Sequence, residues 1–200
     1  MKNLLIKENH SSKNLFEKIN ILNEQQLSSI AQGLDWTLNN ISSAVLIGGT
    51  AVIYYITGAR DLTPDLDFMV HDISLVKNRL SMDDIHYSEL NVGYEQPLGL
   101  TVESLNTDYL DSQIGNSKLN NLILSTYILG NIGGRQVKII NPELLAISKF
   151  ETSRNKDVND AFSLLSSGKI NKEKYNKYLS ELKPTLNDYE SIKSYNNFIV

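Results

Sequence analysis

The 200-residue chain contains no cysteine, which excludes disulfide bonds, thiolate metal ligands and cysteine nucleophiles. Its three histidines, His10, His71 and His86, are scattered and show no metal-ligand spacing. No apolar run approaches the roughly 18 residues that a membrane-spanning helix needs, and the first residues do not resemble a targeting segment. We therefore expect a cytoplasmic protein without a membrane-spanning segment.

Basic residues are also in short supply, because 19 Lys and Arg face 23 Asp and Glu, giving a formal charge of −4. Such a chain has no general attraction to a polyanion, so a nucleic-acid partner would have to meet a local basic patch. Apolar residues make up 41% of the chain and charged residues 21%. This composition is sufficient for one compact globular unit with a helical appendage.

The spacing of apolar residues predicts helices in the first and last parts of the chain. Apolar residues recur every three or four positions over residues 12–41, which predicts two helices or one bent helix. Pro142 is expected to start a later helix, and Gly168 to end the one after it. Two further helices are expected at about 172–182 and 185–199.

The middle of the chain is predicted to form strands. An apolar run at 44–47 ends at Gly48-Gly49, and a buried helix is expected next, capped by Thr50 and closed by Gly58. After Pro64 a strand is expected in which Leu66, Phe68 and Val70 alternate with Asp65, Asp67 and Met69, so that the two sets lie on opposite faces.

Two more strand regions and one short helix complete this part. Alternation over 98–105 predicts a strand, and residues 73–80 are expected to form a helix. The segments 122–128 and 136–140 flank three glycines and predict a hairpin.

Asp65 and Asp67 are the strongest chemical signal in the sequence. Residues two apart in a strand share a face, so the two carboxylates start about 6 to 7 Å apart at the backbone. One of the two pKa values must rise unless a cation or a hydrogen-bond network compensates the repulsion, and hard oxygen ligands suit Mg²⁺ or Mn²⁺. An Asp-x-Asp pair alone is also compatible with a solvated strand face.

The diglycine turn offers a phosphate site. Backbone N–H groups at a helix start can face a phosphate when no Cβ is in the way, as at Gly48 and Gly49, and Thr50 adds a hydroxyl. The alternative is that the two glycines only make a tight turn between strand and helix.

These residues carry a family resemblance. Gly48-Gly49-Thr50-Ala51, followed by Arg60, Thr63 and Asp65-Leu66-Asp67-Phe68, resembles the signature of the polymerase β-like nucleotidyltransferase superfamily. Residues 142–149 and 154–160 resemble the later motifs of its AbiEii toxin group, which comprises the abortive-infection and MenT-like toxins. The similarity covers about residues 45–165 in separated blocks.

The resemblance implies a magnesium site and a nucleoside triphosphate as substrate. Asp65 and Asp67 would hold one or two Mg²⁺ ions, or Mn²⁺. The family usually adds a third carboxylate, for which Glu103 is the candidate although an aspartate is more common there. A surface glutamate is the alternative for Glu103, and Asp108 and Asp111 are the reserve ligands.

The resemblance also implies the phosphate contacts. Gly48, Gly49 and Thr50 would hold the β and γ phosphates, and Lys149 would add a point charge. Arg60 is a further candidate, with pairing to a nearby aspartate as the alternative.

Asp157 and Asp160 match the acidic positions of the last motif of the toxin group. They would position the acceptor or orient Lys149. An ordinary surface ion pair between Lys156 and Asp160 is the structural alternative.

We thus expect an α+β fold with a small mixed sheet flanked by helices. Residues 1–141 would form a nucleotidyltransferase core, and 142–200 a helical segment that contributes to the site. The reaction would move a nucleoside monophosphate from an NTP to a hydroxyl of RNA, a tRNA 3′ end or a protein. By analogy the protein would be a toxin in a toxin–antitoxin or phage-defence pair, with an antitoxin as partner.

Three alternatives stay open at this point. Gly-Gly-x-Ala followed by Asp-x-Asp is also similar to aminoglycoside nucleotidyltransferases, whose acceptors are small molecules. A catalytically silent nucleotide-binding or partner-binding protein is a second alternative. The third concerns the tyrosines and lysines after residue 168, which could bind RNA or form a solvated helical pair.

Overall fold

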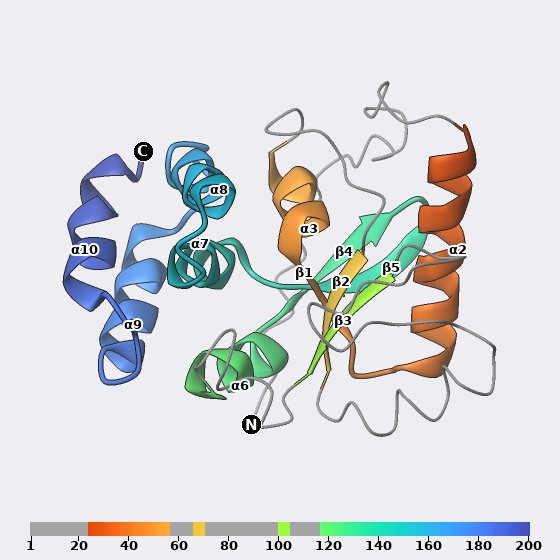
Figure 1. Cartoon of the computed structure of the whole chain (residues 1–200), viewed down its shortest axis with the longest axis horizontal. Helices are drawn as coiled ribbons and strands as arrows, with labels where there is room; N and C mark the ends of the chain where they lie inside the picture. The colour runs from red at the N-terminus through yellow and green to blue at the C-terminus, as the bar shows by residue number, and fades with distance from the viewer. Residues whose placement is uncertain (1–23, 57–65, 71–99, 105–116) are drawn as a thin grey trace.

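The computed structural model describes residues 24–56, 66–70, 100–104 and 117–200, and the statements below concern these residues. They form a mixed α and β structure in which a five-stranded sheet lies among helices (Figure 1). The expected α+β class is therefore confirmed at this level. Within the described ranges, no helix has both the length and the apolar character needed to cross a lipid bilayer.

The sheet has the strand order β3-β2-β1-β5-β4. The strands are β1 (Val45–Ile47), β2 (Leu66–Val70), β3 (Leu100–Ser104), β4 (Ile128–Ile132) and β5 (Arg135–Ile139). Strand β1 runs antiparallel to β2 and parallel to β5, while β2 and β3 are parallel and β4 and β5 antiparallel. The sheet is mixed, as the sequence predicted.

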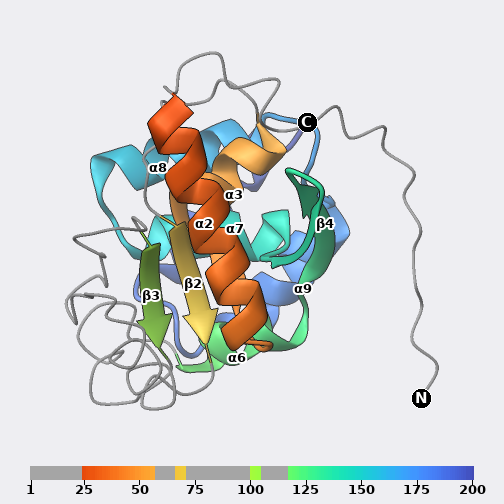
Figure 2. The same ribbon diagram turned by 90° about the vertical axis from the view of Figure 1, so that its right-hand side faces the viewer.

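Helices cover both faces of the sheet. Helix α2 (Glu24–Asn40) lies on one face, and α3 (Gly48–Tyr55) and α7 (Pro142–Glu151) lie on the other, as Figure 2 shows. Helix α6 (Ser117–Ser125) packs against both β2 and α7. The sheet therefore forms the middle layer, and α7 is the helix that contacts the C-terminal helices.

The C-terminal helices pack on the side of α7 away from the sheet (Figure 1). They are α8 (Asn155–Leu165), α9 (Lys172–Leu182), α10 (Tyr189–Ser194) and the short 3₁₀ helix η1 (Tyr195–Phe198). The predicted boundary between residues 141 and 142 stays a prediction. Buried apolar side chains on both of its sides belong to one continuous cluster.

Two predicted elements differ from the structure. Residues 122–125 belong to helix α6, so the first arm of the hairpin is Ile128–Ile132. Gly130 lies inside this arm. Glycine is needed there because a Cβ would come within 2.5 Å of Ile139 Cδ1 and 2.7 Å of Tyr54 Oη. The last predicted helix is shorter than expected and is divided into α10 and η1.

The start of α3 also differs from its prediction. Thr50 is not the cap, because the helix begins at Gly48 after Ile47, which makes no side-chain cap bond. The helix ends at Tyr55, before Gly58. The predicted helices at 73–80 and before residue 24 lie outside the described residues.

Helix α7 begins at a buried cap. The Asn141 side chain accepts a hydrogen bond from Leu144 N at 2.9 Å, and Pro142 occupies the first turn as predicted. The same side chain donates through Nδ2 to the Thr126 carbonyl at 2.7 Å. Asn141 therefore fixes the start of α7 to the segment that leads from α6 into β4.

We expect Asn141→Ala to lower the free energy of unfolding by about 2 to 4 kcal/mol. The cap contributes about 1 kcal/mol, and loss of the buried donor leaves the Thr126 carbonyl without its partner. Asn171→Ala is the matched control, because Asn171 caps α9 through Lys174 N at the same 2.9 Å but is exposed. Urea unfolding should give about 1 kcal/mol for the control, and equal losses would contradict the bridging role of Asn141.

Candidate functional site

The acidic strand meets the diglycine turn at Asp67. In the antiparallel pairing of β1 and β2, Ile47 lies opposite Asp67, so Gly48 follows directly. A Cβ built on Gly48 would lie 1.8 Å from Asp67 Oδ2 and 2.5 Å from its Cγ. The carboxylate therefore occupies the space in which any other residue at position 48 would place its side chain.

Two independent constraints require glycine at position 48. Its φ is +66°, a left-handed conformation that costs an L residue about 1 to 2 kcal/mol. The Asp67 carboxylate supplies the second constraint, because it leaves no room for a Cβ. The turn and the carboxylate are thus fitted to each other.

The Asp67 carboxylate lies at the positive end of α3. The first N–H groups of a helix have no partner within the helix, and the helix dipole favours negative charge there. Gly49 and Thr50, in this first turn, are buried. Such a place suits a carboxylate that stabilises the helix start, and it equally suits a carboxylate beside a bound phosphate.

The other predicted metal ligands are only partly described. Asp65 lies outside the described residues, as do Arg60, the reserve residues Asp108 and Asp111, and the three histidines. In the parallel pairing of β2 and β3, Asp67 lies opposite Thr101, and Glu103 lies opposite Met69. The role of Glu103 stays a prediction. Among the described side chains alone, no group of three or more possible metal ligands is complete.

A second group of charged residues joins α7 to α8. Lys149 Nζ lies 2.5 Å from Asp157 Oδ1 and 3.3 Å from Asp160 Oδ2. All three side chains are buried, and Asp157 has no exposed surface. Burial of these charges is compatible with a stable fold because Lys149 offsets one of the two negative charges, and Arg154, which also binds Asp157, offsets the other.

Asp157 receives two more hydrogen bonds at its second oxygen. Thr152 Oγ1 donates to Oδ2 at 2.9 Å, and Arg154 donates to the same atom through Nε. Burial alone would raise the pKa of Asp157, but the hydrogen bond and charge of Lys149, with Thr152 and Arg154, lower it below its ordinary value. Asp157 therefore keeps its negative charge in the protein interior.

These contacts agree with one of the two predicted roles for the aspartates, which is to orient Lys149. The alternative, a surface ion pair between Lys156 and Asp160, does not explain why Asp160 is buried against Lys149. Neither Thr152 nor Arg154 was predicted from the sequence to be a site residue. The three-residue spacing of Arg154 and Asp157 on one helix start was the available signal.

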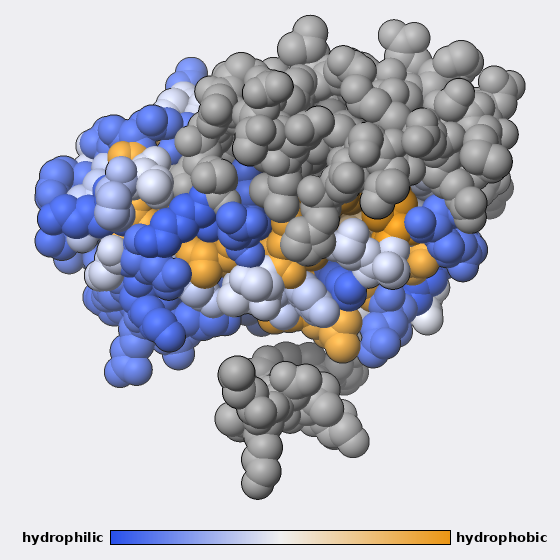
Figure 3. Space-filling model, turned by 90° about the horizontal axis from the view of Figure 1, so that it is seen from below, coloured by the Kyte–Doolittle hydropathy of each residue, from blue (hydrophilic) through white to orange (hydrophobic). Residues whose placement is uncertain are grey.

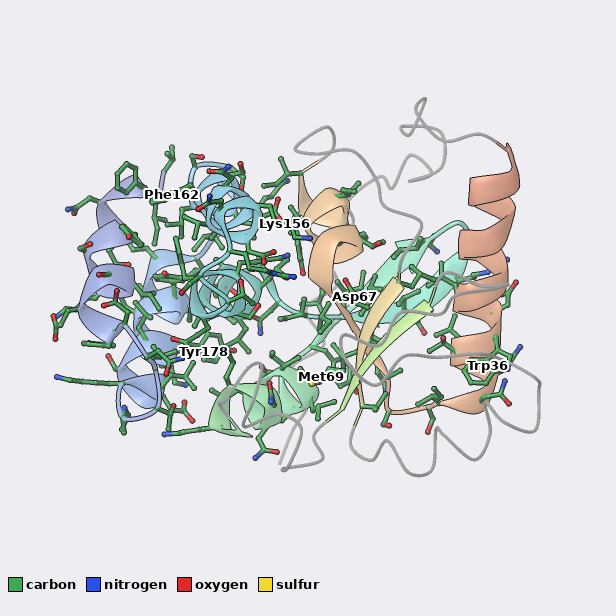
Figure 4. The ribbon with its side chains drawn as sticks, viewed as in Figure 1. Trp36, Asp67, Met69, Lys156, Phe162 and Tyr178 are labelled. Carbon is green, nitrogen blue, oxygen red and sulfur yellow. The ribbon has the colours of Figure 1, made fainter. Side chains whose placement is uncertain are left out.

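Helix α3 lies beside both groups. It begins at Gly48, where Asp67 lies, and it packs against α7 and α8. Figure 4 shows Asp67 at the base of α3 and Lys156 in the region between α8 and α3. Of the predicted site residues whose side chains the structure describes, those at the start of α3 form one group, and Lys149, Asp157 and Asp160 form the other on the helices that α3 packs against.

The C-terminal tyrosines do not form a continuous stacking surface. Tyr175 and Tyr178 are buried in the apolar core, and burial raises the pKa of Tyr175. Tyr195 packs against Phe150 with ring centroids 4.7 Å apart. Seen from below, the C-terminal helices present mostly hydrophilic side chains (Figure 3). These observations favour the solvated helical pair over an aromatic platform for RNA.

We expect Gly48→Ala to lower the free energy of unfolding by about 2 to 4 kcal/mol, from backbone strain and from contact with Asp67. Gly168→Ala is the matched control, because Gly168 has φ +69° and nothing lies within 4 Å of a Cβ built there. The control should lose about 1 to 2 kcal/mol. Adding Asp67→Gly should recover about 1 kcal/mol at position 48 in urea unfolding. No recovery would contradict the contact.

We expect Asp157→Asn to lower the free energy of unfolding by about 3 to 5 kcal/mol at pH 7, because Lys149 loses a buried charged partner. The folded pKa of Asp157 is depressed, so its contribution is present above the unfolded value near 3.8 and is lost as pH falls through the folded value. The difference between wild type and variant should therefore shrink near pH 3. Urea unfolding at both pH values measures it.

Asp35→Asn is the control for this pH experiment. Asp35 also has a lowered pKa through its hydrogen bond with Arg135, but the pair is exposed, so its loss should cost less than about 1 kcal/mol. A gap for Asp157→Asn that is equally large at pH 7 and pH 3 would contradict the depressed pKa.

Comparison with known proteins adds no family to these observations. No protein-family model matches the chain, and no curated protein matches its sequence. Function is therefore inferred from the two groups of residues described above, and from the contact between Asp67 and the start of α3.

Proposed function

We propose that the protein is a metal-dependent nucleotidyltransferase that moves a nucleoside monophosphate from an NTP to an acceptor hydroxyl and releases pyrophosphate. One observation carries the proposal: the Asp67 carboxylate lies against Gly48 at the start of α3. A strand carboxylate beside a glycine-rich helix start brings together a cation ligand and a phosphate-binding element. The sequence motifs predicted that the Asp67 carboxylate would lie beside the diglycine turn.

The residues at this place fit a magnesium ion in their chemistry. Carboxylate oxygens are the ligands that Mg²⁺ prefers, and Asp67 offers one at a turn where the missing Cβ of Gly48 leaves room for the carboxylate. Asp65 and Glu103 are the further ligands that the sequence predicts. When bound, Mg²⁺ would neutralise charge on the phosphates of the substrate.

The described residues have definite tasks in this scheme. Asp67 holds negative charge at the start of α3, and Gly48 allows it to approach the backbone closely. The first-turn N–H groups of α3 bind a phosphate oxygen. Lys149, oriented by Asp157 and Asp160, supplies positive charge from the neighbouring helix.

The acceptor and the biological setting are finer parts of the same proposal. RNA, a tRNA 3′ end or a protein is the proposed class of acceptor, and a toxin with an antitoxin partner is the proposed setting. The two blocks of sequence motifs, in their order along the chain, support this part.

Asp67→Asn should reduce nucleotide transfer by at least about 100-fold, because asparagine keeps a hydrogen-bond acceptor beside α3 but loses the charge that holds a cation. The measurement incubates the full chain with each α-labelled NTP, Mg²⁺ and total RNA, and follows label in RNA, in protein and in small molecules. EDTA should abolish transfer by the wild type.

Asp35→Asn is the matched control for this assay, because it makes the same substitution at an exposed ion pair and should leave transfer unchanged. Equal transfer by Asp67→Asn and wild type would reject Asp67 as a ligand. Binding of NTP without any release of pyrophosphate would favour the silent nucleotide-binding protein instead.

A further inference from the structure

Two arginines of the described chain are each held by an aspartate, but in different ways. Arg135 bonds to the protein through all three guanidinium nitrogens: Nε and Nη2 donate to Asp35 at 2.5 and 2.6 Å, and Nη1 donates to the Gly133 carbonyl at 3.0 Å. Arg154 donates to Asp157 through Nε, and within the described residues it has no second partner. Its side chain is 54% exposed.

The anchor of Arg154 is rigid. Asp157 has no exposed surface, and both of its oxygens are fixed by donors from α7 and from the turn after it. A guanidinium group that is bound through Nε keeps its Nη1 and Nη2 edge in a set direction. Arg154 therefore presents an oriented pair of donors at the surface.

A second cation follows this arginine closely in the chain. Lys156 is exposed in the first turn of α8, two residues after Arg154. Figure 4 shows it in the region between α8 and α3, the helix that begins at Gly48 beside Asp67. Lys149 and Arg154 balance the negative charges of Asp157 and Asp160, so Lys156 gives this surface one net positive charge.

We infer that Arg154 and Lys156 form a phosphate-binding subsite next to the Lys149 group. The arginine binds two phosphate oxygens through Nη1 and Nη2, and the lysine adds a mobile point charge. The phosphate belongs to the triphosphate of the nucleotide or to the backbone of a nucleic-acid acceptor. This inference rests on the proposed function for the identity of the ligand, and on geometry for the site.

Pre-orientation is the physical reason for affinity here. A free surface arginine loses side-chain entropy when it binds, whereas Arg154 is already restrained by Asp157.

The test titrates the full-length chain with two probes by calorimetry. Inorganic tripolyphosphate has no base for the protein to prefer, and a single-stranded RNA of about ten nucleotides with a 5′ hydroxyl supplies only backbone phosphates. Arg154→Lys should weaken binding about tenfold, because one ammonium cannot hold Asp157 and also chelate a phosphate. Arg135→Lys is the matched control and should bind as the wild type does.

Lys156→Gln is the second variant, because this exposed side chain can be removed without disturbing the buried group. It should weaken binding of whichever probe Arg154→Lys affects by about threefold, and this loss of affinity should diminish at high salt. Thermal unfolding first establishes that every variant is folded at the temperature of the titration.

The outcomes separate the sources of phosphate. Weaker binding of tripolyphosphate alone assigns the subsite to the nucleotide, and weaker binding of RNA alone assigns it to the acceptor backbone. Unchanged binding of both probes by Arg154→Lys and Lys156→Gln overturns the inference, as does a wild type that binds neither probe. Failure of label transfer with intact, Arg154-dependent binding would reject the proposed function and leave the subsite standing.

Discussion

The C-terminal half of the molecule depends on the burial of three charges on α7. Glu143, Lys149 and Glu151 all lie within a helix that is covered on nearly every side, and a buried charge is costly unless it is paired. Each takes its partners from a different segment. Glu143 accepts from Asn171 N at 2.9 Å, Lys149 pairs with Asp157 on α8, and Glu151 accepts two bonds from Asn187 at 3.1 Å. The arrangement of α8, α9 and the start of α10 follows from these pairings.

The two acids at the end of α7 and the start of α8 show how the partners decide the charge state. Burial raises the pKa of Glu151, and the Asn187 donors only partly oppose this effect, with Asp188 adding to it. Asp157 is also buried, yet its pKa is lowered because two cations and a hydroxyl bind it. Neutral donors can accommodate a carboxylate in the interior, but cations are needed to keep it ionised. Asp157 is therefore the permanent charge to which Lys149 and Arg154 are attached.

The sequence predicted elements better than contacts. The alternation around Asp67 and the glycines at 48 and 49 predicted a strand and a turn, but the pairing of Ile47 with Asp67, which brings the carboxylate onto Gly48, is a tertiary fact. The segment after Asn121 was assigned to a strand because a short apolar run does not distinguish a buried strand from a helix. In α6, Leu119, Ile123 and Leu124 are the buried apolar positions, which is helical spacing. Burial of Asp160 was likewise hidden, because the same residue spacing would serve a surface ion pair.

Helix α3 physically connects the two groups of polar residues. Its first residue has a conformation and a clearance that only glycine provides, and the carboxylate that uses this clearance comes from the central region of the sheet. The body of the same helix packs against α7 and α8, which carry Lys149 and its aspartates. A shift of α3 would therefore move the strand carboxylate relative to the lysine. A triphosphate needs negative ligands for a cation and positive contacts for its own oxygens, held at fixed separation. Helix α3 is short and is buried along the first five residues after Gly48, so it is a rigid means of holding the Asp67 carboxylate and Lys149 at a fixed separation.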